Sequence, residues 1–209
     1  MPSRAPVPGH APGRPLVLAS ASPRRADLLR LLGLDFSVRP TSVDETLRPG
    51  EAPGDLAERL ARAKAVALPE PPRPGAVLAA DTVVAIDSTI LGKPGGVEDA
   101  RRMLRLLAGR VHEVTTAFAL RTAPEESLVS ERAVSRVRFA PMSEEEIAWY
   151  AATGEGDDKA GAYALQGIGA LFVVAIEGSY TNVIGLPLER LYPHLRRLGY
   201  FGAATHRSA

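Results

Sequence analysis

The residues with the clearest chemical potential in this chain are Ser20-Ala21-Ser22-Pro23-Arg24-Arg25, which follow the apolar run 16–19. Ser22 can cap a helix and Pro23 suits its first position, so the pattern predicts a helix that begins beside two arginines. Free N–H groups at such a start favour negative charge, and guanidinium groups match phosphate oxygens. The segment therefore predicts a site for a phosphate-bearing ligand. A solvated surface helix is the alternative that it leaves open.

Asp81 is a carboxylate in the middle of the apolar run 76–86. Burying an unpaired carboxylate costs several kcal/mol, so we expect Asp81 to face a cleft, a cation or a hydrogen-bond network. A strand-end aspartate bonded to nearby backbone is the alternative. Asp44 and Glu45 lie in a proline-rich loop and could join it, although loop acids are commonly just solvated. Because Mg²⁺ takes few carboxylates and keeps water or substrate oxygens, Asp81 with Glu45 would suffice for a divalent cation.

Other segments offer groups for a phosphate or a base. Lys93 lies in the glycine-rich loop 92–96, and Lys64 lies beside the apolar stripe of a predicted helix. Lys159 and Gln166 lie in the loop 154–167, whose glycines and polar residues are typical of a binding loop. The lysines could neutralise phosphates, and the Gln166 amide could read the edge of a nucleobase. Each of them also fits an exposed surface position.

Several classes of site are excluded or unsupported. The chain has no cysteine, which excludes thiol catalysis and cysteine-bound zinc and fits a reducing compartment such as the cytoplasm. The loop around Lys93 is not a Walker A motif, and no serine-hydrolase or zincin motif is present. No second histidine lies at metal-ligand spacing from His112, so we interpret His112 as structural. A net charge of +1, 5% aromatic residues and no long apolar run argue against nucleic-acid and membrane partners.

The pattern of elements predicts a mixed α/β fold. We expect a disordered N-terminal extension at 1–14, a single domain at 15–199 and a C-terminal tail at 200–209. Alternating or continuous apolar runs predict strands at 16–20, 36–39, 76–86, 89–91, 111–122, 128–140 and 171–176. Helical spacing or capping signals predict helices at 23–32, from about 55 to 67, from 100 to an end at Gly109, at 143–153 and at 188–198. The turns at 87–88 and 124–126 favour antiparallel pairs, which argue against a purely parallel sheet.

Six ordered blocks of the chain resemble the Maf family of nucleoside triphosphate pyrophosphatases. The blocks are Ser20-Ala21-Ser22-Pro23-Arg24-Arg25, Val43-Asp44-Glu45, Ala80-Asp81-Thr82, Gly92-Lys93-Pro94, Gly109-Arg110-Val111-His112 and residues 158–167. The resemblance runs from about residue 15 to 198. It implies a fold like that of inosine triphosphatase, with an elongated mixed sheet, flanking helices, a cleft between two lobes and frequently a homodimer. It also implies cleavage of a nucleotide between its α and β phosphates with Mg²⁺ or Mn²⁺.

The resemblance further implies roles for single residues. It implies Asp81 as the catalytic aspartate, Glu45 as a further acidic position, and phosphate binding by Ser20, Arg25, Lys64 and Lys93. Arg24, Thr82 and Gln166 match the branch that acts on dTTP and UTP. A pyrophosphatase for 7-methyl-GTP or other noncanonical purine nucleotides, and a nucleotide-responsive protein that regulates septum formation, are the alternatives. Gly156 stands where the family usually has proline, which predicts a looser loop around Lys159.

Overall fold

The computed structural model describes residues 14–69, 73–123 and 127–201 and contains one seven-stranded mixed sheet. The strands are β1 (Leu16–Leu18), β2 (Ser37–Val38), β3 (Gly75–Ile86), β4 (Thr89–Leu91), β5 (Val111–Ala123), β6 (Leu128–Phe139) and β7 (Val173–Glu177). Their order is β2-β1-β3-β5-β6-β7, and β4 also pairs with β3. β1 is parallel to β2 and β3, whereas the other pairs are antiparallel. The predicted mixed α/β fold is confirmed.

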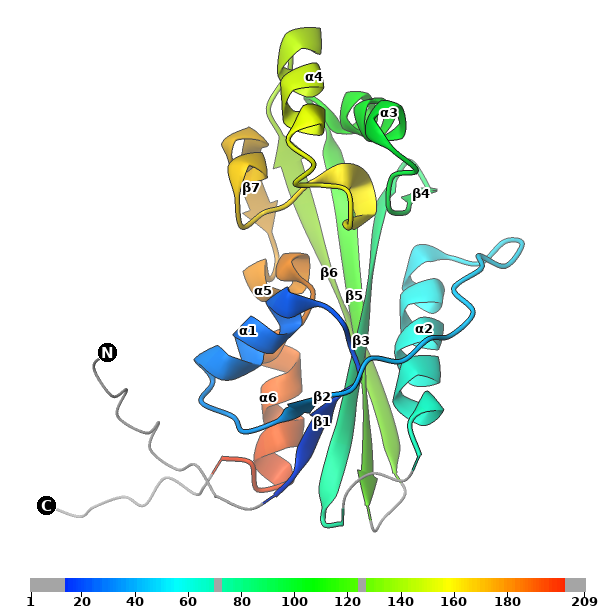
Figure 1. The fold of residues 1–209 in the computed structure, drawn as a ribbon, viewed down its shortest axis with the longest axis vertical. Coiled ribbons are helices and arrows are strands. Elements are labelled where there is room, and N and C mark those ends of the chain that lie inside the picture. Colours follow the sequence, from blue (N-terminus) through cyan, green and yellow to red (C-terminus); the bar gives the residue numbers. More distant parts are fainter. Residues whose placement is uncertain (1–13, 70–72, 124–126, 202–209) are drawn as a thin grey trace, which may run out of the picture.

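Three long antiparallel strands, β3, β5 and β6, run through the length of the molecule (Figure 1). Their side chains alternate between the two faces of the sheet. On β3, Ala76, Leu78 and Ala80 belong to one hydrophobic cluster, whereas Val77 and Ala79 belong to another. A strand that is apolar on both faces must be covered on both, which explains why the run 76–86 shows no alternation in the sequence.

Helices cover both faces and the upper end of the sheet (Figure 1). The helices are α1 (Pro23–Leu31), α2 (Pro53–Ala67), α3 (Val97–Leu107), α4 (Glu144–Ala152), α5 (Tyr180–Ile184) and α6 (Leu188–Arg197), with 3₁₀ turns η1 (Ala160–Ala162) and η2 (Ile168–Phe172). α1 and α6 share the first hydrophobic cluster, α2 packs on the opposite face in the second, and α3 and α4 form a third cluster with the far ends of β3, β5 and β6. The molecule therefore has two lobes that the long strands connect.

One edge of β3 is left open between these lobes. β1 pairs with residues 76–78 and β4 pairs with residues 84–86. Among the strands that the structure describes, none covers residues 79–83 on that side. This gap lies just beyond the carboxyl end of β1, where ligands bind in open α/β sheets. Asp81 and Thr82 lie in the middle of it.

The C-terminal third of the domain differs most from the sequence prediction. The strand expected at 171–176 begins at Val173, because residues 168–172 form a 3₁₀ turn instead. The short helix α5 was not predicted. Tyr200 is buried in the first cluster and its hydroxyl donates to the Pro15 carbonyl. The expected turn at 124–126, most of the expected extension at 1–14 and most of the tail lie outside the described residues.

None of the helices in the described part of the chain has the length and apolar character that a membrane crossing requires.

Candidate active site

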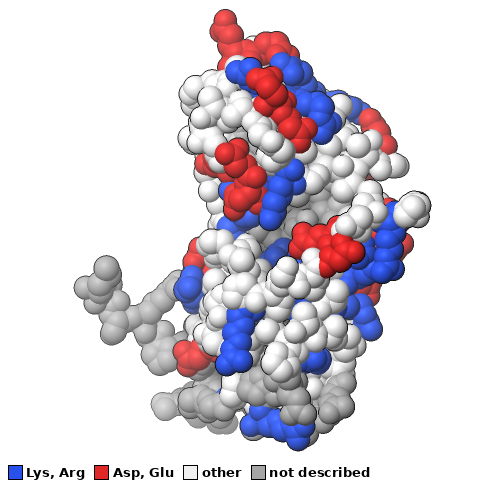
Figure 2. Space-filling view, turned by 45° about the vertical axis from the view of Figure 1, so that its right-hand side comes forward, with Lys and Arg blue, Asp and Glu red and all other residues white. Residues whose placement is uncertain are grey.

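A cleft of about 580 Å³ opens between the two lobes at the uncovered edge of β3. Figure 2 shows a hollow in the middle of the molecule, with charged side chains of both signs around the opening. The lining includes these residues predicted from the sequence: Arg24, Arg25, Glu45, Lys64, Asp81, Thr82, Lys93, Lys159 and Gln166. Ser20 is not among the lining residues, but its Oγ accepts a hydrogen bond from Arg25, which is. Segments that are far apart in the sequence thus meet in one cleft.

Helix α1 begins at the cleft as predicted, but its cap is different. Ser22 makes no side-chain capping bond, so the predicted capping role is wrong. Its backbone N–H instead donates to Ser20 Oγ at 3.2 Å. Ser20 Oγ also accepts from Arg25 Nη1 at 3.0 Å. Because both contacts use Ser20 as an acceptor, its hydroxyl proton is available for another partner, such as a phosphate oxygen.

Arg25 is held in one orientation by three separate acceptors. Its Nε donates to the Gly185 carbonyl at 2.8 Å, Nη1 to Ser20, and Nη2 to Thr82 Oγ1 at 3.0 Å. Burial lowers the pKa of Arg25 from its usual value, while the nearby charge of Asp81 opposes the shift. A guanidinium with such a high intrinsic pKa stays charged, so Arg25 presents a fixed cation at the cleft.

Lys64 joins the two candidate carboxylates. Its Nζ lies 2.6 Å from Asp81 Oδ1 and 2.6 Å from Glu45 Oε1. Burial raises the pKa of Asp81 above its usual value, and Lys64 and Arg25 oppose the rise. Burial also disfavours the charged form of Glu45, but the hydrogen bond and charge of Lys64 outweigh it and lower the pKa of Glu45. Asp81 therefore faces both a cleft and a cation, as predicted.

The same pair of carboxylates fits part of a divalent metal site. No group of three or more histidine, cysteine, aspartate or glutamate side chains within residues 14–69, 73–123 and 127–201 converges on one point. Two carboxylates that meet at the cleft leave the remaining positions to water or substrate oxygens, which is the arrangement that Mg²⁺ accepts. Asp44 does not join them, because it is exposed and accepts a hydrogen bond from the Thr46 N–H.

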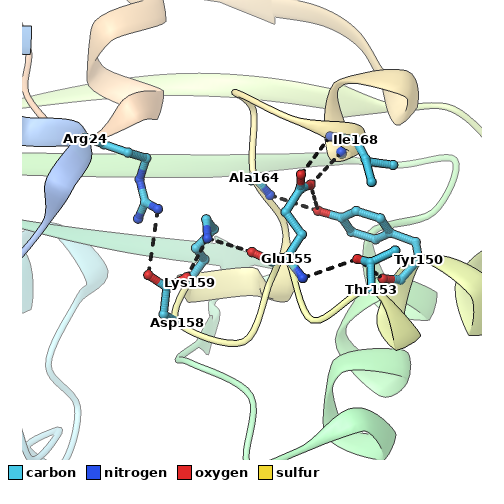
Figure 3. A network of polar contacts seen from close by, with 9 residues as sticks. Arg24, Tyr150, Thr153, Glu155, Asp158, Lys159, Ala164 and Ile168 are labelled. Atoms are coloured by element: carbon cyan, nitrogen blue, oxygen red, sulfur yellow. Dashed lines mark hydrogen bonds and ion pairs between the residues drawn. The ribbon is translucent and has the colours of Figure 1, made fainter. Parts of the chain in front are cut away.

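The upper wall of the cleft is the loop 154–167, which Glu155 organises (Figure 3). The Glu155 carboxylate accepts hydrogen bonds from the Tyr150 hydroxyl and from the N–H groups of Ile168 and Gly169. Burial disfavours its charged form, but these donors prevail and lower the pKa of Glu155. A single carboxylate thereby fixes the two ends of the loop to each other and to α4.

Asp158 connects this loop to α1 across the cleft (Figure 3). It pairs with Lys159 at 2.5 Å and lies 3.9 Å from Arg24 Nη1. Lys159 also donates to the Glu155 carbonyl at 2.6 Å. Asp158 lines the cleft, although no pattern in the sequence gave it a separate role. Lys93 and Gln166 reach the cleft from exposed positions on two loops, which are joined by a hydrogen bond from the Gly161 N–H to the Gly92 carbonyl.

Gly156 does not loosen the loop as expected from the sequence. It is buried, and a Cβ atom added there would lie 2.1 Å from the Ala162 carbonyl oxygen. The two loop segments approach so closely that a side chain has no room. Glycine is needed here for close packing, so its presence indicates a tight loop and not a flexible one.

His112 lies behind the cleft and not at its surface. It is 1% exposed, and its Nε2 lies 2.9 Å from the hydroxyl of Tyr163, which lines the cleft. Burial lowers the pKa of His112 from 6.5 to about 4, so the ring is neutral at physiological pH. A neutral, buried ring packed against Phe139 and Tyr163 agrees with the structural interpretation.

One pattern and two buried residues were missed from the sequence. The chain has only three lysines, Lys64, Lys93 and Lys159, and all three line the cleft. The chain has 22 arginines, so the scarcity of lysine is a signal in the sequence that could have predicted a common site for the three. Thr116 and Asn182 form a buried polar network behind Thr82. No spacing signal marks them, because they belong to a long strand and a five-residue helix.

Comparison with known proteins gives the family. A family model described as Maf-like protein matches residues 15–198. A dTTP/UTP pyrophosphatase of Anaeromyxobacter sp. (strain Fw109-5) is 50% identical over 88% of this chain and 90% of its own length. Another from Syntrophomonas wolfei is 47% identical over 87% of this chain and 96% of its own. A solved HAM1 protein from Coxiella burnetii shares the fold, with a TM-score of 0.50 and 18% identity over 88% of this chain and 100% of that one. This chain belongs to the Maf family.

Proposed function

We propose that this protein is a nucleoside triphosphate pyrophosphatase that hydrolyses dTTP and UTP to the nucleoside monophosphate and pyrophosphate. The names of relatives at about 50% identity support this activity. The observation that carries it is the meeting of Asp81, Arg25 and all three lysines of the chain in one cleft. A polyanionic triphosphate is the ligand that such a concentration of fixed cations favours.

In the proposed mechanism, Asp81 activates the attacking water, and the cationic side chains bind the phosphates. Asp81 orients a water molecule and takes its proton as the water attacks a phosphorus in line with the leaving oxygen. Arg25, Lys93 and Lys159 bind the phosphate oxygens, and the Ser20 hydroxyl donates to one of them. Catalysis then comes mostly from positioning and from charge stabilisation in a site formed before the substrate arrives.

The two carboxylates at the cleft are the proposed ligands of a divalent metal ion. Asp81 and Glu45 would hold Mg²⁺ or Mn²⁺ together with substrate oxygens, and the ion would neutralise charge that develops on the phosphates. Lys64 contacts both carboxylates, so it keeps them together and balances their charge before the ion binds.

Arg24, Thr82 and Gln166 are the proposed source of substrate preference. Arg24 and Gln166 both line the cleft, Arg24 from α1 and Gln166 from the end of the loop 154–167. The Gln166 amide offers one acceptor and two donors, which can match the edge of a pyrimidine ring. A preference for 7-methyl-GTP or another purine nucleotide is the competing assignment for the same cleft.

A product assay tests the proposed activity. Purified protein is incubated with dTTP, UTP and 7-methyl-GTP, separately and in competition, with Mg²⁺ or Mn²⁺, and the products are separated. We expect pyrophosphate and monophosphate from dTTP and UTP, at a higher kcat/KM than from 7-methyl-GTP. Orthophosphate as the first product would contradict the proposed position of cleavage. A higher kcat/KM for 7-methyl-GTP would contradict the proposed substrate class.

The homodimer and a role in septum formation stay predictions from the family resemblance, and the cytoplasmic location stays a prediction from the lack of cysteine. Light scattering on the purified protein tests the homodimer.

A further inference from the structure

Behind the cleft lies a buried polar network that the proposed mechanism does not use. Thr116 on β5 and Asn182 on α5 are both 0% exposed. The Asn182 amide accepts from the Thr116 N–H at 3.0 Å and donates to the Val114 carbonyl and to Ser135 Oγ at 2.9 and 2.8 Å. All of its donors are therefore used, and the side chain is locked between β5 and α5.

The network reaches the cleft through hydroxyl groups. Thr116 Oγ1 donates to the Asn182 carbonyl at 2.8 Å and lies 2.9 Å from Thr82 Oγ1. Thr82 Oγ1 in turn accepts from Arg25 Nη2 at 3.0 Å. A continuous chain of contacts thus runs from the backbone of α5 to the arginine of the phosphate site.

The groups at the two ends of this network determine which atom donates in each of its hydrogen bonds. A guanidinium can only donate, and a carbonyl can only accept. Thr116 has given its proton to Asn182, so the contact between the two threonines requires Thr82 to donate to Thr116. The Thr82 proton is therefore committed to the protein interior, and Thr82 has no proton left to donate to a nucleobase.

Helix α5 also holds Arg25 by a second route. The Gly185 carbonyl, directly after α5, accepts from Arg25 Nε, and Gly185 has a φ of 121°. This left-handed conformation is readily adopted by glycine, and it ends the helix next to the arginine. Arg25 thus depends on α5 at both Nε and Nη2.

We infer that Thr116 and Asn182 are positioning residues of the phosphate site, which act through the Thr82 hydroxyl to aim the Arg25 guanidinium. The inference rests on the proposed function, because it assigns the aimed arginine to a triphosphate. It also gives Thr82 a second role, the support of Arg25, beside its proposed part in substrate preference. A residue that is only structural would stabilise the fold without acting through Arg25.

A double-mutant cycle between Thr116 and Arg25 separates these roles. Thr116→Val keeps the shape of the side chain and removes the hydroxyl, Thr116→Ser keeps the hydroxyl, and Arg25→Ala removes the group that is aimed. Two quantities are measured: kcat/KM for dTTP, and the affinity for inorganic tripolyphosphate by calorimetry, which does not depend on hydrolysis. Circular dichroism and thermal unfolding confirm that each variant is folded.

We expect Thr116→Val to lower both quantities about tenfold in the otherwise native protein, since the Thr82 hydroxyl that accepts from Arg25 loses the acceptor that fixes its orientation. Thr116→Ser should stay within about twofold, and Thr116→Val should change either quantity by less than about twofold once Arg25 is alanine. The inference would be overturned if Thr116→Val left both quantities unchanged, or if it lowered them equally when Arg25 is alanine. If Thr116→Val does not fold, Thr82→Val at its half-buried position replaces it in the same cycle and is judged by the same outcomes.

The two proposals fail differently in this experiment. Absence of pyrophosphate release from every nucleotide by the native protein would contradict the proposed function, while the tripolyphosphate cycle would still test the positioning role. Normal pyrophosphate release with no coupling between Thr116 and Arg25 would contradict the positioning role alone.

Discussion

At the scale of single residues, the choice between lysine and arginine is informative. All three lysines of the chain line the cleft, whereas most of its 22 arginines lie elsewhere. An ammonium is a compact charge with three rotatable donors, while a guanidinium is a larger planar fork. Lys64 lies between two carboxylates at 2.6 Å from each, with its side chain only 12% exposed. Such a narrow position suits the ammonium, so charge alone does not explain why a lysine and not an arginine occupies it.

Lys64→Arg should therefore impair the enzyme although the charge is kept. The larger head group would push Asp81 or Glu45 away from its present position, and we expect kcat/KM to fall by about 10 to 100-fold. Arg62→Lys is the matched control, since Arg62 lies on the same helix and donates to Ser130 at an exposed position. Steady-state kinetics on both variants check this. Activity of Lys64→Arg within about twofold of native would mean that any cation suffices there.

His112 predicts how stability depends on pH. Nε2 contacts Tyr163, and Nδ1 is buried without a hydrogen-bond partner in the described part of the chain, so a second proton has no acceptor. With a folded pKa of about 4 against 6.5, the unfolded state binds more protons between these values. Stability is then fully present above pH 6.5 and is lost as the pH falls toward 4, by about 3 kcal/mol.

His112→Gln removes this titration and keeps a polar group that can face Tyr163. Chemical denaturation between pH 7 and pH 4 measures the free energy of unfolding of both proteins. The native protein should lose more stability over this range than the variant, by about the same 3 kcal/mol. Parallel pH profiles for the two proteins would rule out His112 as the cause.

At the scale of elements, the loop 154–167 works as a rigid wall of the cleft. Glu155 fixes its ends, and the close approach of Gly156 to Ala162 fixes its middle. The loop carries Lys159 and Gln166 to the cleft. Its rigidity thus sets the positions of Lys159, the proposed phosphate ligand, and Gln166, the proposed base contact.

Gly156→Ala should disturb this wall. A methyl group 2.1 Å from a carbonyl oxygen forces the backbone apart, and we expect a loss of stability of about 1 to 3 kcal/mol together with a higher KM for dTTP. Gly95→Ala is the control, because its added Cβ would meet no atom closer than 3.9 Å. Thermal unfolding and steady-state kinetics give both readouts. A Gly156→Ala protein with native stability and native KM would show that the loop adapts freely.

Elements were predictable from the sequence where they are long. The strands β3, β5 and β6 and the helices α2, α3 and α6 extend over enough residues for a period to show. Helix α5 has five residues between Gly178 and Gly185, and its N-cap, Ser179, becomes recognisable only when its side chain is seen to accept from the Asn182 N–H. The Ser22 side chain also differs from the prediction, since it makes no capping bond and the N–H of Ser22 donates to Ser20 Oγ. Whether a serine side chain makes a capping bond depends on its conformation, which leaves no trace in residue spacing.

At the scale of the whole molecule, the cleft exists because two short strands leave a gap along a long one. β1 and β4 pair with different parts of β3, and the residues between them face the space between the lobes. The alternation of side chains along β3 then sends Asp81 toward Lys64 on α2 and Thr82 toward Arg25 on α1. The two faces of the sheet thus contribute different chemistry to one site.

The sequence predicted which residues form this site better than how they are arranged. Charged or polar residues in glycine-rich or apolar surroundings, such as Lys93 and Asp81, stood out by type. The contact of Lys64 with both carboxylates, the position of Asp158 between Arg24 and Lys159, and the support of Arg25 by α5 depend on three-dimensional packing across the sheet. Spacing along one chain cannot report contacts of that kind.

The most direct test of the central claim is pyrophosphate release from dTTP by Asp81→Asn, compared with native protein and with Asp44→Asn as control. The substitution keeps the shape of Asp81 and removes its charge. Asp44 is a suitable control because it precedes Glu45 in the sequence, is exposed and does not line the cleft. We predict a fall in turnover of about 10² to 10³-fold for Asp81→Asn and native turnover for Asp44→Asn. Near-native turnover by a folded Asp81→Asn protein would contradict the account.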